Sequence, residues 1–286
     1  MADFPLEQGI GDIKVLQTLG LTEDPFSLSA SPRFFHLGES HQSVYYFAHN
    51  SITRRDGLAL VMGEVGMGKS SLARVLFSHF FEERADVIIS YVPSANWKSR
   101  TKAVREISDS LAELEVETKR SYDDSIYELQ KAIMRAHREN NLNVAVLLDE
   151  SHLISPGALE AIHELYNFDV DVKAVQIIMF GQPELDALIS KHAHLKSRVS
   201  KRLYLSPLSY IAALEMINHR VRQAGRTTSL LTDEAYGRIF DVSQGVPRDI
   251  VGLCGNALEI IIRDKKKIID EEAAEEAILL RYGQQG

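Results

Sequence analysis

The chain has 286 residues, of which 45% are hydrophobic and 25% are charged, and its formal net charge is −8. This length fits one large α/β domain, or a core joined to a smaller second domain. The acidic total excludes a nucleic-acid-binding surface that covers the whole molecule, although a local basic patch remains compatible with it. The one cysteine, Cys254, excludes an internal disulfide framework and favours a reducing compartment.

The sequence contains neither the pattern of a membrane span nor that of a signal peptide. Its longest apolar runs, 144–148 and 175–180, are far shorter than the roughly 20 residues that cross a bilayer. Residues 1–7 lack the basic and apolar segments of a secretory signal. We therefore expect a cytoplasmic protein without a membrane span.

The first part of the chain alternates between strand and helix signals. A turn-prone N-terminal stretch precedes a helix-like segment over 40–53. Continuous apolar runs, typical of strands buried on both faces of a parallel sheet, predict strands over 58–62, 87–92, 144–148, 174–180 and 203–205. Helices are expected between them, over 71–82, 101–115, 123–139, 156–166 and 183–200. This order predicts a parallel α/β core.

After Pro207 the strand signals stop. Helical stretches follow at about 208–224, 232–242, 247–263 and 270–281. Thr232 is a suitable N-cap for the second of these, and Pro247 suits the first turn of the third. We therefore expect an N-terminal extension over 1–57, an α/β core over 58–206 and a helical lid over 207–286.

The most specific motif is a P-loop. Residues 63–70 read Gly-Glu-Val-Gly-Met-Gly-Lys-Ser and fit G-x-x-x-x-G-K-[ST] at every fixed position, between a strand signal and a helix signal. Lys69 is expected to reach the β- and γ-phosphates, and the Ser70 hydroxyl to hold Mg²⁺. A chance glycine-rich turn is the alternative. The expected nucleotide-binding residues are Gly63, Glu64, Val65, Gly66, Met67, Gly68, Lys69, Ser70 and Ser71.

A second motif consists of two carboxylates, Asp149 and Glu150, at the end of the apolar run 144–148. Ligands of open α/β sheets gather at the carboxyl ends of strands. Asp149 is expected to coordinate Mg²⁺ and Glu150 to polarise the attacking water. A strand that ends in solvated acids is the alternative, which the preceding P-loop disfavours. The two motifs together predict ATP binding and hydrolysis.

Several later residues are candidates for positioning or charge stabilisation, which phosphoryl transfer requires more than covalent chemistry. Gln182 follows the fourth strand signal and can orient the lytic water, or it is a turn residue. Arg198 and Arg202 can reach the nucleotide of a neighbouring subunit, with a surface salt bridge as the alternative for each. Arg248 begins a lid helix and can contact the γ-phosphate.

These motifs resemble those of the AAA+ ATPases. The similarity is greatest to the ExeA-like (general secretion pathway A) group, which includes transposition ATPases related to TnsC and MuB. It extends over most of the chain, and Gly181-Gln-Pro-Glu-Leu185 with Gly245-Val-Pro-Arg248 is its most specific part. The other matching segments are 19–27, 31–34, 63–69, 148–153, 203–208 and 243–248. The chain departs from the group at 38–41 and at Ser70-Ser71, where Thr-Thr is commoner, but Ser70 keeps the hydroxyl.

The resemblance implies a fold, a set of roles and an activity. It implies an αβα core with strand order 5-1-4-3-2, a helical lid, and ATP with Mg²⁺ bound at subunit interfaces. Gln182 would be sensor 1, Arg248 sensor 2, and an arginine near 198–202 the arginine finger. Pro25 and Phe26 would line the base pocket. Hydrolysis in such ATPases can be slow and regulatory.

One basic segment favours DNA binding. It follows the second strand signal and places one aromatic residue among four cations, namely Trp97, Lys98, Arg100, Lys102 and Arg105. In DNA-binding relatives this region faces the central channel, where such residues contact phosphates without reading sequence. A solvated helix start is the alternative. The histidines indicate no metal site, since His152 and His163 lack a third partner at zinc-ligand spacing.

Three functions remain open at this point. The first is an ATPase that forms a ring or helical filament on double-stranded DNA, selects a transposition target and recruits a transposase, with target-selector proteins as further partners. The second is an assembly ATPase of a secretion or pilus system that does not act on DNA. The third is a nucleotide-gated scaffold with little hydrolysis. The end of the chain at Gly286, without an apolar 20-mer, favours the first over a membrane-anchored role.

Overall fold

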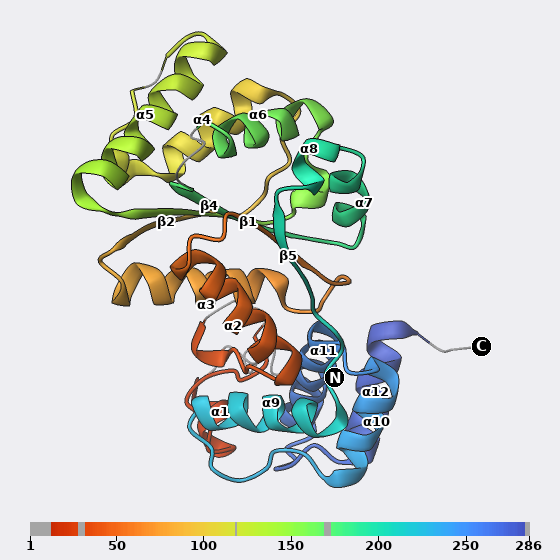
Figure 1. The fold of residues 1–286 in the computed structure, drawn as a ribbon. Coiled ribbons are helices and arrows are strands. Elements are labelled where there is room, and N and C mark those ends of the chain that lie inside the picture. Colours follow the sequence, from red (N-terminus) through yellow and green to blue (C-terminus); the bar gives the residue numbers. More distant parts are fainter. Residues whose placement is uncertain (1–12, 28–31, 118, 169–172, 284–286) are drawn as a thin grey trace. The chain divides into compact units, whose positions relative to one another are not determined.

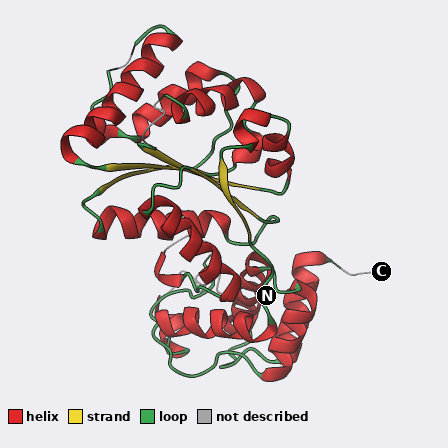
Figure 2. Ribbon diagram, in the orientation of Figure 1, coloured by secondary structure: helices red, strands yellow, loops and turns green. Residues whose placement is uncertain are grey.

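The protein is described here by a computed structural model that covers residues 13–27, 32–117, 119–168 and 173–283. The chain divides into two compact units, one formed by Ser40–Ser206 and the other by Met1–Glu39 together with Pro207–Gly286. Residues 40–57 therefore lie in the first unit, whereas the described residues before them lie in the second. Figures 1 and 2 show that strands occur in the first unit and that the second is helical.

The α/β unit contains one five-stranded parallel sheet. Its strands are β1 (Leu58–Met62), β2 (Val87–Val92), β3 (Asn143–Leu148), β4 (Val175–Gly181) and β5 (Val199–Tyr204). Their order is β2-β3-β4-β1-β5, which confirms the expected order 5-1-4-3-2. In the register of the sheet Met62 is opposite both Gly181 and Tyr204, and Leu148 is opposite Met179. The carboxyl ends of β1, β3 and β4 are therefore neighbours at one edge.

Helices cover both faces of this sheet. Side chains alternate between the two faces along each strand, so apolar strands present a surface for helix packing on each face. The α-helices of the unit are α2 (Glu39–Thr53), α3 (Lys69–Glu83), α4 (Arg100–Ser110), α5 (Tyr122–Asn140), α6 (Pro156–Tyr166), α7 (Glu184–Ser190) and α8 (Ala193–Lys196), and its 3-10 helices are η2 (Ala112–Leu114) and η3 (Ser151–Leu153). Leu58, Leu60 and Met62 pack in one core cluster with α4, α5 and α6. Helices α2 and α3 lie on the opposite face (Figure 1). Burial on both faces explains the continuous apolar runs of β1 to β4.

The expected helix over 183–200 is wrong in its last third. The chain forms α7 and the single turn of α8, and β5 then begins at Val199. Strand β5 lies at the edge of the sheet and pairs only with β1. Since an edge strand is partly solvated, its sequence Val-Ser-Lys-Arg-Leu-Tyr lacks the apolar run by which the other strands are recognised.

The second unit is a helical bundle. Its helices are α1 (Ile13–Thr18), η1 (Pro32–Phe34), α9 (Tyr210–Gln223), α10 (Asp233–Ser243), α11 (Pro247–Arg263) and α12 (Glu271–Tyr282). Side chains of Ser209, Thr232 and Asp270 accept hydrogen bonds from the first turns of α9, α10 and α12. No helix in the described part of the chain has both the length and the apolar character that a bilayer crossing requires.

Two glycines of the α/β unit provide a test of this packing. Gly57, just before β1, has φ +94°, and a Cβ there would collide with the Tyr166 ring. Gly157 lies in the first turn of α6, where a Cβ would meet no atom within 4 Å. We expect Gly57→Ala to lower the free energy of unfolding by more than about 1 kcal/mol, and Gly157→Ala to raise it by up to about 1 kcal/mol. Urea unfolding of both variants measures the two signs, and equal effects would contradict the packing described.

Candidate functional site

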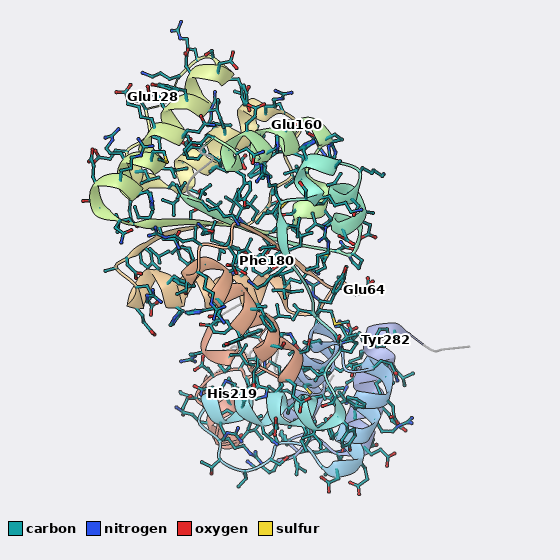
Figure 3. All side chains as sticks on the ribbon, viewed as in Figure 1. Glu64, Glu128, Glu160, Phe180, His219 and Tyr282 are labelled. Carbon is teal, nitrogen blue, oxygen red and sulfur yellow. The ribbon has the colours of Figure 1, made fainter. Side chains whose placement is uncertain are left out.

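The P-loop connects the end of β1 to the start of α3, and two of its glycines adopt left-handed backbone conformations. Gly66 and Gly68 both have φ 85°. Gly68 is the N-cap of α3 and provides no side chain to cap the helix. The first N–H groups of α3 are therefore not used by a capping side chain, which is the arrangement that binds anions at helix N-termini. Glu64 is exposed on the same loop (Figure 3), and so is Val65.

Lys69 is buried within this loop, with only 6% of its surface exposed. Its Nζ donates to the backbone oxygens of Gly63 and Glu64, both at 2.8 Å. His41 of α2 supports the loop from the other side, since its Nε2 lies 2.8 Å from the Met67 oxygen. His41 lies in the segment 38–41, and its contact with the loop was not predicted.

Asp149 and Glu150 follow β3 and differ in environment. Asp149 is almost fully buried, and its two carboxylate oxygens accept hydrogen bonds from the Tyr91 hydroxyl at 3.0 Å and the Glu150 N–H at 2.8 Å. Burial and the neighbouring Asp149 charge raise the pKa of Tyr91 to about 12, so Tyr91 remains a donor. Glu150 is partly exposed and has φ 52°, a left-handed conformation that ends the strand abruptly.

His152 connects Glu150 with Gln182. The Gln182 backbone N–H donates to His152 Nδ1 at 3.4 Å, and the Gln182 amide nitrogen lies 2.9 Å from His152 Nε2. His152 Nε2 is also 3.7 Å from a Glu150 carboxylate oxygen. Gly181 permits the close approach of the His152 backbone, because a Cβ at position 181 would lie only 3.1 Å from the His152 backbone nitrogen. His152, which we expected to be an ordinary core or surface histidine, therefore positions two candidate catalytic residues.

Three arginines were candidates for charge stabilisation, two in the α/β unit and one in the helical unit. Arg198 precedes β5 at the amino ends of the strands, is exposed, and has no ion-pair partner among the described residues. Arg202 lies within β5, and its Nε donates to the Asp186 carboxylate at 2.8 Å. Arg248 is exposed in the first turn of α11 in the helical unit.

Pro25 and Phe26 also lie in the helical unit. Phe26 is buried in its core, and the Pro25 oxygen accepts a hydrogen bond from Arg220 at 3.1 Å. Arg220 is itself buried, and desolvation lowers the pKa of its guanidinium. The 25–26 segment is thus held firmly by α9, and its role in base binding stays a prediction.

One expected DNA contact is corrected. Trp97 is fully buried in the core of the α/β unit, and its indole N–H donates to a Glu106 carboxylate oxygen at 2.6 Å. The ring is therefore not available to stack on a nucleic acid. The four neighbouring cations are exposed, although Arg100 pairs with Glu164 at 3.0 Å and Lys102 with Glu106 at 3.4 Å.

Comparison with known proteins identifies the fold of this chain. Residues 52–189 match the family model described as "AAA domain". The chain is similar to Cdc6p from Pyrobaculum aerophilum, with a TM-score of 0.69, 16% identity, and coverage of 94% of this chain and 71% of that chain. It is also similar to the Aeropyrum pernix ORC1 protein solved in complex with DNA, with a TM-score of 0.68, 16% identity, and coverage of 90% and 68%. The fold is the α/β P-loop fold of AAA+ ATPases.

One relative is similar to this chain in sequence over most of this chain's length. The chain is 30% identical over 250 residues to the general secretion pathway protein A of Aeromonas hydrophila. The aligned region covers 85% of this chain and 44% of that protein. This chain thus spans less than half the length of that relative. The chain is therefore similar to an AAA domain over residues 52–189 and to part of general secretion pathway protein A.

The buried position of Lys69 leads to a prediction for nucleotide binding. We expect Lys69→Ala to weaken ATP binding about 10- to 100-fold, because hydrogen bonds to a charged group contribute about 1.5–3 kcal/mol. Isothermal titration with Mg²⁺ and ATP measures the change. Lys98→Ala removes an exposed lysine of the same unit and should leave the affinity unchanged. Unaltered affinity in Lys69→Ala would show that the nucleotide binds elsewhere.

Proposed function

We propose that this protein binds ATP with Mg²⁺ and hydrolyses it. The observation that carries the proposal is the adjacency of three loops, since the P-loop, Gln182 and the Asp149-Glu150 pair follow neighbouring strands at one edge of the sheet. Residues 63–71 would hold the phosphates, with Lys69 on the β- and γ-phosphates. The Ser70 hydroxyl and the Asp149 carboxylate would hold Mg²⁺, which prefers oxygen ligands.

The residues of this chain would each perform one part of the reaction. Glu150 polarises the attacking water, and Gln182 orients it, as sensor 1 does. His152 holds both side chains in position through the contacts at 2.9 and 3.7 Å. Bound Mg²⁺ neutralises charge on the phosphates. Because hydrolysis also requires positive charge that Lys69 alone does not supply, a further arginine completes the site.

We propose that this arginine comes from a neighbouring subunit. Arg198 lies at the amino ends of the strands, whereas the P-loop of the same chain follows a carboxyl end, so Arg198 serves a different subunit's nucleotide. Arg202 is the weaker candidate because Asp186 already pairs with it. Arg248 acts as sensor 2 and links nucleotide state to the helical unit, and Pro25 and Phe26 line the base pocket. ATP thereby controls assembly into a ring or helical filament.

A substitution of Glu150 separates a slow ATPase from a scaffold with little hydrolysis. Glu150→Gln keeps the size of the side chain but removes the carboxylate. We expect phosphate release to fall at least about 100-fold, because general-base assistance contributes about 10²–10⁴-fold, while ATP affinity is kept. Single-turnover phosphate release and ATP titration measure the two quantities. Equal phosphate release by Glu150→Gln and the unaltered protein would favour the scaffold.

We propose that this ATPase assembles on double-stranded DNA and regulates transposition. In this role it would select a target and recruit a transposase. Four exposed cations at the start of α4 support DNA contact, and an assembly would repeat this patch along a duplex. The Aeropyrum pernix ORC1 protein, which has a similar fold, has been solved in complex with DNA. A second function, assembly of a secretion or pilus system, is favoured by the 30% identity to general secretion pathway protein A.

The salt dependence of DNA binding distinguishes these two functions. Lys98 and Arg105 have no ion-pair partner among the described residues, so they are the best candidates for phosphate contacts. We expect Lys98→Ala/Arg105→Ala to weaken ATP-dependent binding to random-sequence duplex DNA and to reduce the slope of log affinity against log salt by about two. Fluorescence anisotropy at several salt concentrations measures both.

The matched control for this experiment is Lys131→Ala/Arg135→Ala, which removes two exposed cations from α5 of the same unit. This variant should bind DNA as the unaltered protein does. A protein that assembles with ATP but ignores DNA at low salt would support the secretion or pilus function instead.

A further inference from the structure

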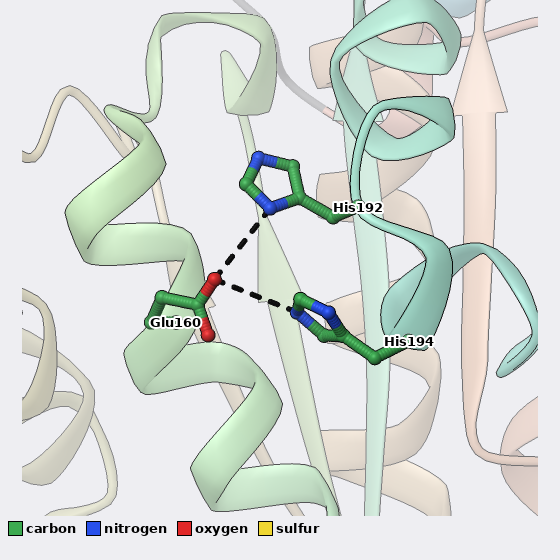
Figure 4. Close-up of side chains that lie close together, drawn as sticks. All are labelled: Glu160, His192 and His194. Atoms are coloured by element: carbon green, nitrogen blue, oxygen red, sulfur yellow. Dashed lines mark ion pairs between the residues drawn. The ribbon is translucent and has the colours of Figure 1, made fainter.

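A second cluster of ligand-type side chains lies in the α/β unit, away from the P-loop. Glu160 is on α6, His192 is the N-cap of α8, and His194 is within α8. A single carboxylate oxygen of Glu160 lies 3.5 Å from His192 Nδ1 and 3.5 Å from His194 Nε2 (Figure 4). The donor atoms of the three residues all lie within 4.8 Å of one another. Among the described residues this is the only such group of three.

The chemistry of this group selects a class of ligand. Two imidazoles and one carboxylate are a donor set that suits Zn²⁺ and similar transition-metal ions, whereas Mg²⁺ prefers oxygen donors. With metal–ligand bonds of about 2.0–2.1 Å, neighbouring donors of a tetrahedral site are separated by about 3.3 Å. The observed separations of 3.5 Å are close to this value. We propose that Glu160, His192 and His194 bind one divalent transition-metal ion of the Zn²⁺ class.

The surroundings of the cluster fit a bound ion that keeps an open position. The three side chains are partly exposed, at 31%, 19% and 39%, so an ion and a water ligand can enter from solvent. The ring of His163 lies edge-on against His194, with a centroid distance of 4.2 Å.

A bound ion would fasten α8 to α6. Residues 192–198 already form a connected turn, in which Leu195 donates to the His192 oxygen and the Arg198 N–H donates to the Leu195 oxygen. An ion shared with Glu160 therefore restrains the segment that leads into β5 and carries Arg198. If Arg198 is the arginine finger, which rests on the proposed function, metal binding also restrains the position of that arginine. The metal site itself does not depend on ATP hydrolysis.

The test uses the full chain, carrying no polyhistidine tag and stripped of metal with a chelator. Zn²⁺ is titrated by calorimetry in saturating Mg²⁺, and Co²⁺ is titrated by visible absorption. We expect one ion per chain, a visible d–d band typical of tetrahedral cobalt, and slower amide exchange over residues 192–198. Glu160→Gln should weaken binding at least about tenfold, and His192→Ala/His194→Ala should abolish it.

Two controls separate this site from other binding. His79→Ala breaks a His–Glu pair on α3, at 3.1 Å, that is not part of a group of three donors, and should leave metal binding unchanged. Asp149→Asn alters the Mg²⁺ site and should also leave Zn²⁺ binding unchanged. Cys254 is not a competing ligand, because burial raises the pKa of its thiol to about 12. Absence of binding, or binding that persists in His192→Ala/His194→Ala, would overturn the proposal and leave Glu160 in ordinary ion pairs.

Discussion

The parallel register of the central sheet is the constraint on which the candidate ATP site depends. Because β1, β4 and β3 are neighbours and run in one direction, the loops that follow Met62, Gly181 and Leu148 emerge side by side. The P-loop glycines, the Gln182 amide and two carboxylates are thereby brought together from distant parts of the chain. The hydrophobic burial of both sheet faces holds these strands in register, so the chemistry at the edge rests on the apolar core.

Hydrogen bonds from residues outside the P-loop and the Asp149-Glu150 pair give the site its order. His41 contacts the P-loop, Tyr91 holds the buried Asp149 carboxylate, and His152 contacts both Gln182 and Glu150. A buried charge without such partners would be costly. These contacts determine where the expected catalytic groups lie. The left-handed conformation of Glu150 contributes as well, because it turns the chain away from the strand directly after Asp149.

The amino ends of the strands carry different residues from the carboxyl ends. At the amino ends, β5 begins after a short turn that contains His192, His194 and the exposed Arg198. In the proposed head-to-tail assembly, Arg198 of one copy would complete the candidate nucleotide site of the next copy. The proposed metal ion would restrain this turn and would thereby affect the proposed assembly.

The sequence by itself determined the elements that depend on local signals. The glycine pattern and the apolar runs predicted the P-loop, the strand order through family resemblance, and the positions of Asp149, Glu150 and Gln182. Edge strand β5 was misjudged because partial exposure removes the apolar run, and Trp97 because an aromatic among cations looks the same whether its ring faces solvent or the core. Only the tertiary structure decided which polar residues meet. His152 with Gln182, Tyr91 with Asp149, and Glu160 with two histidines are each separated along the chain, so no periodicity or spacing records their contact.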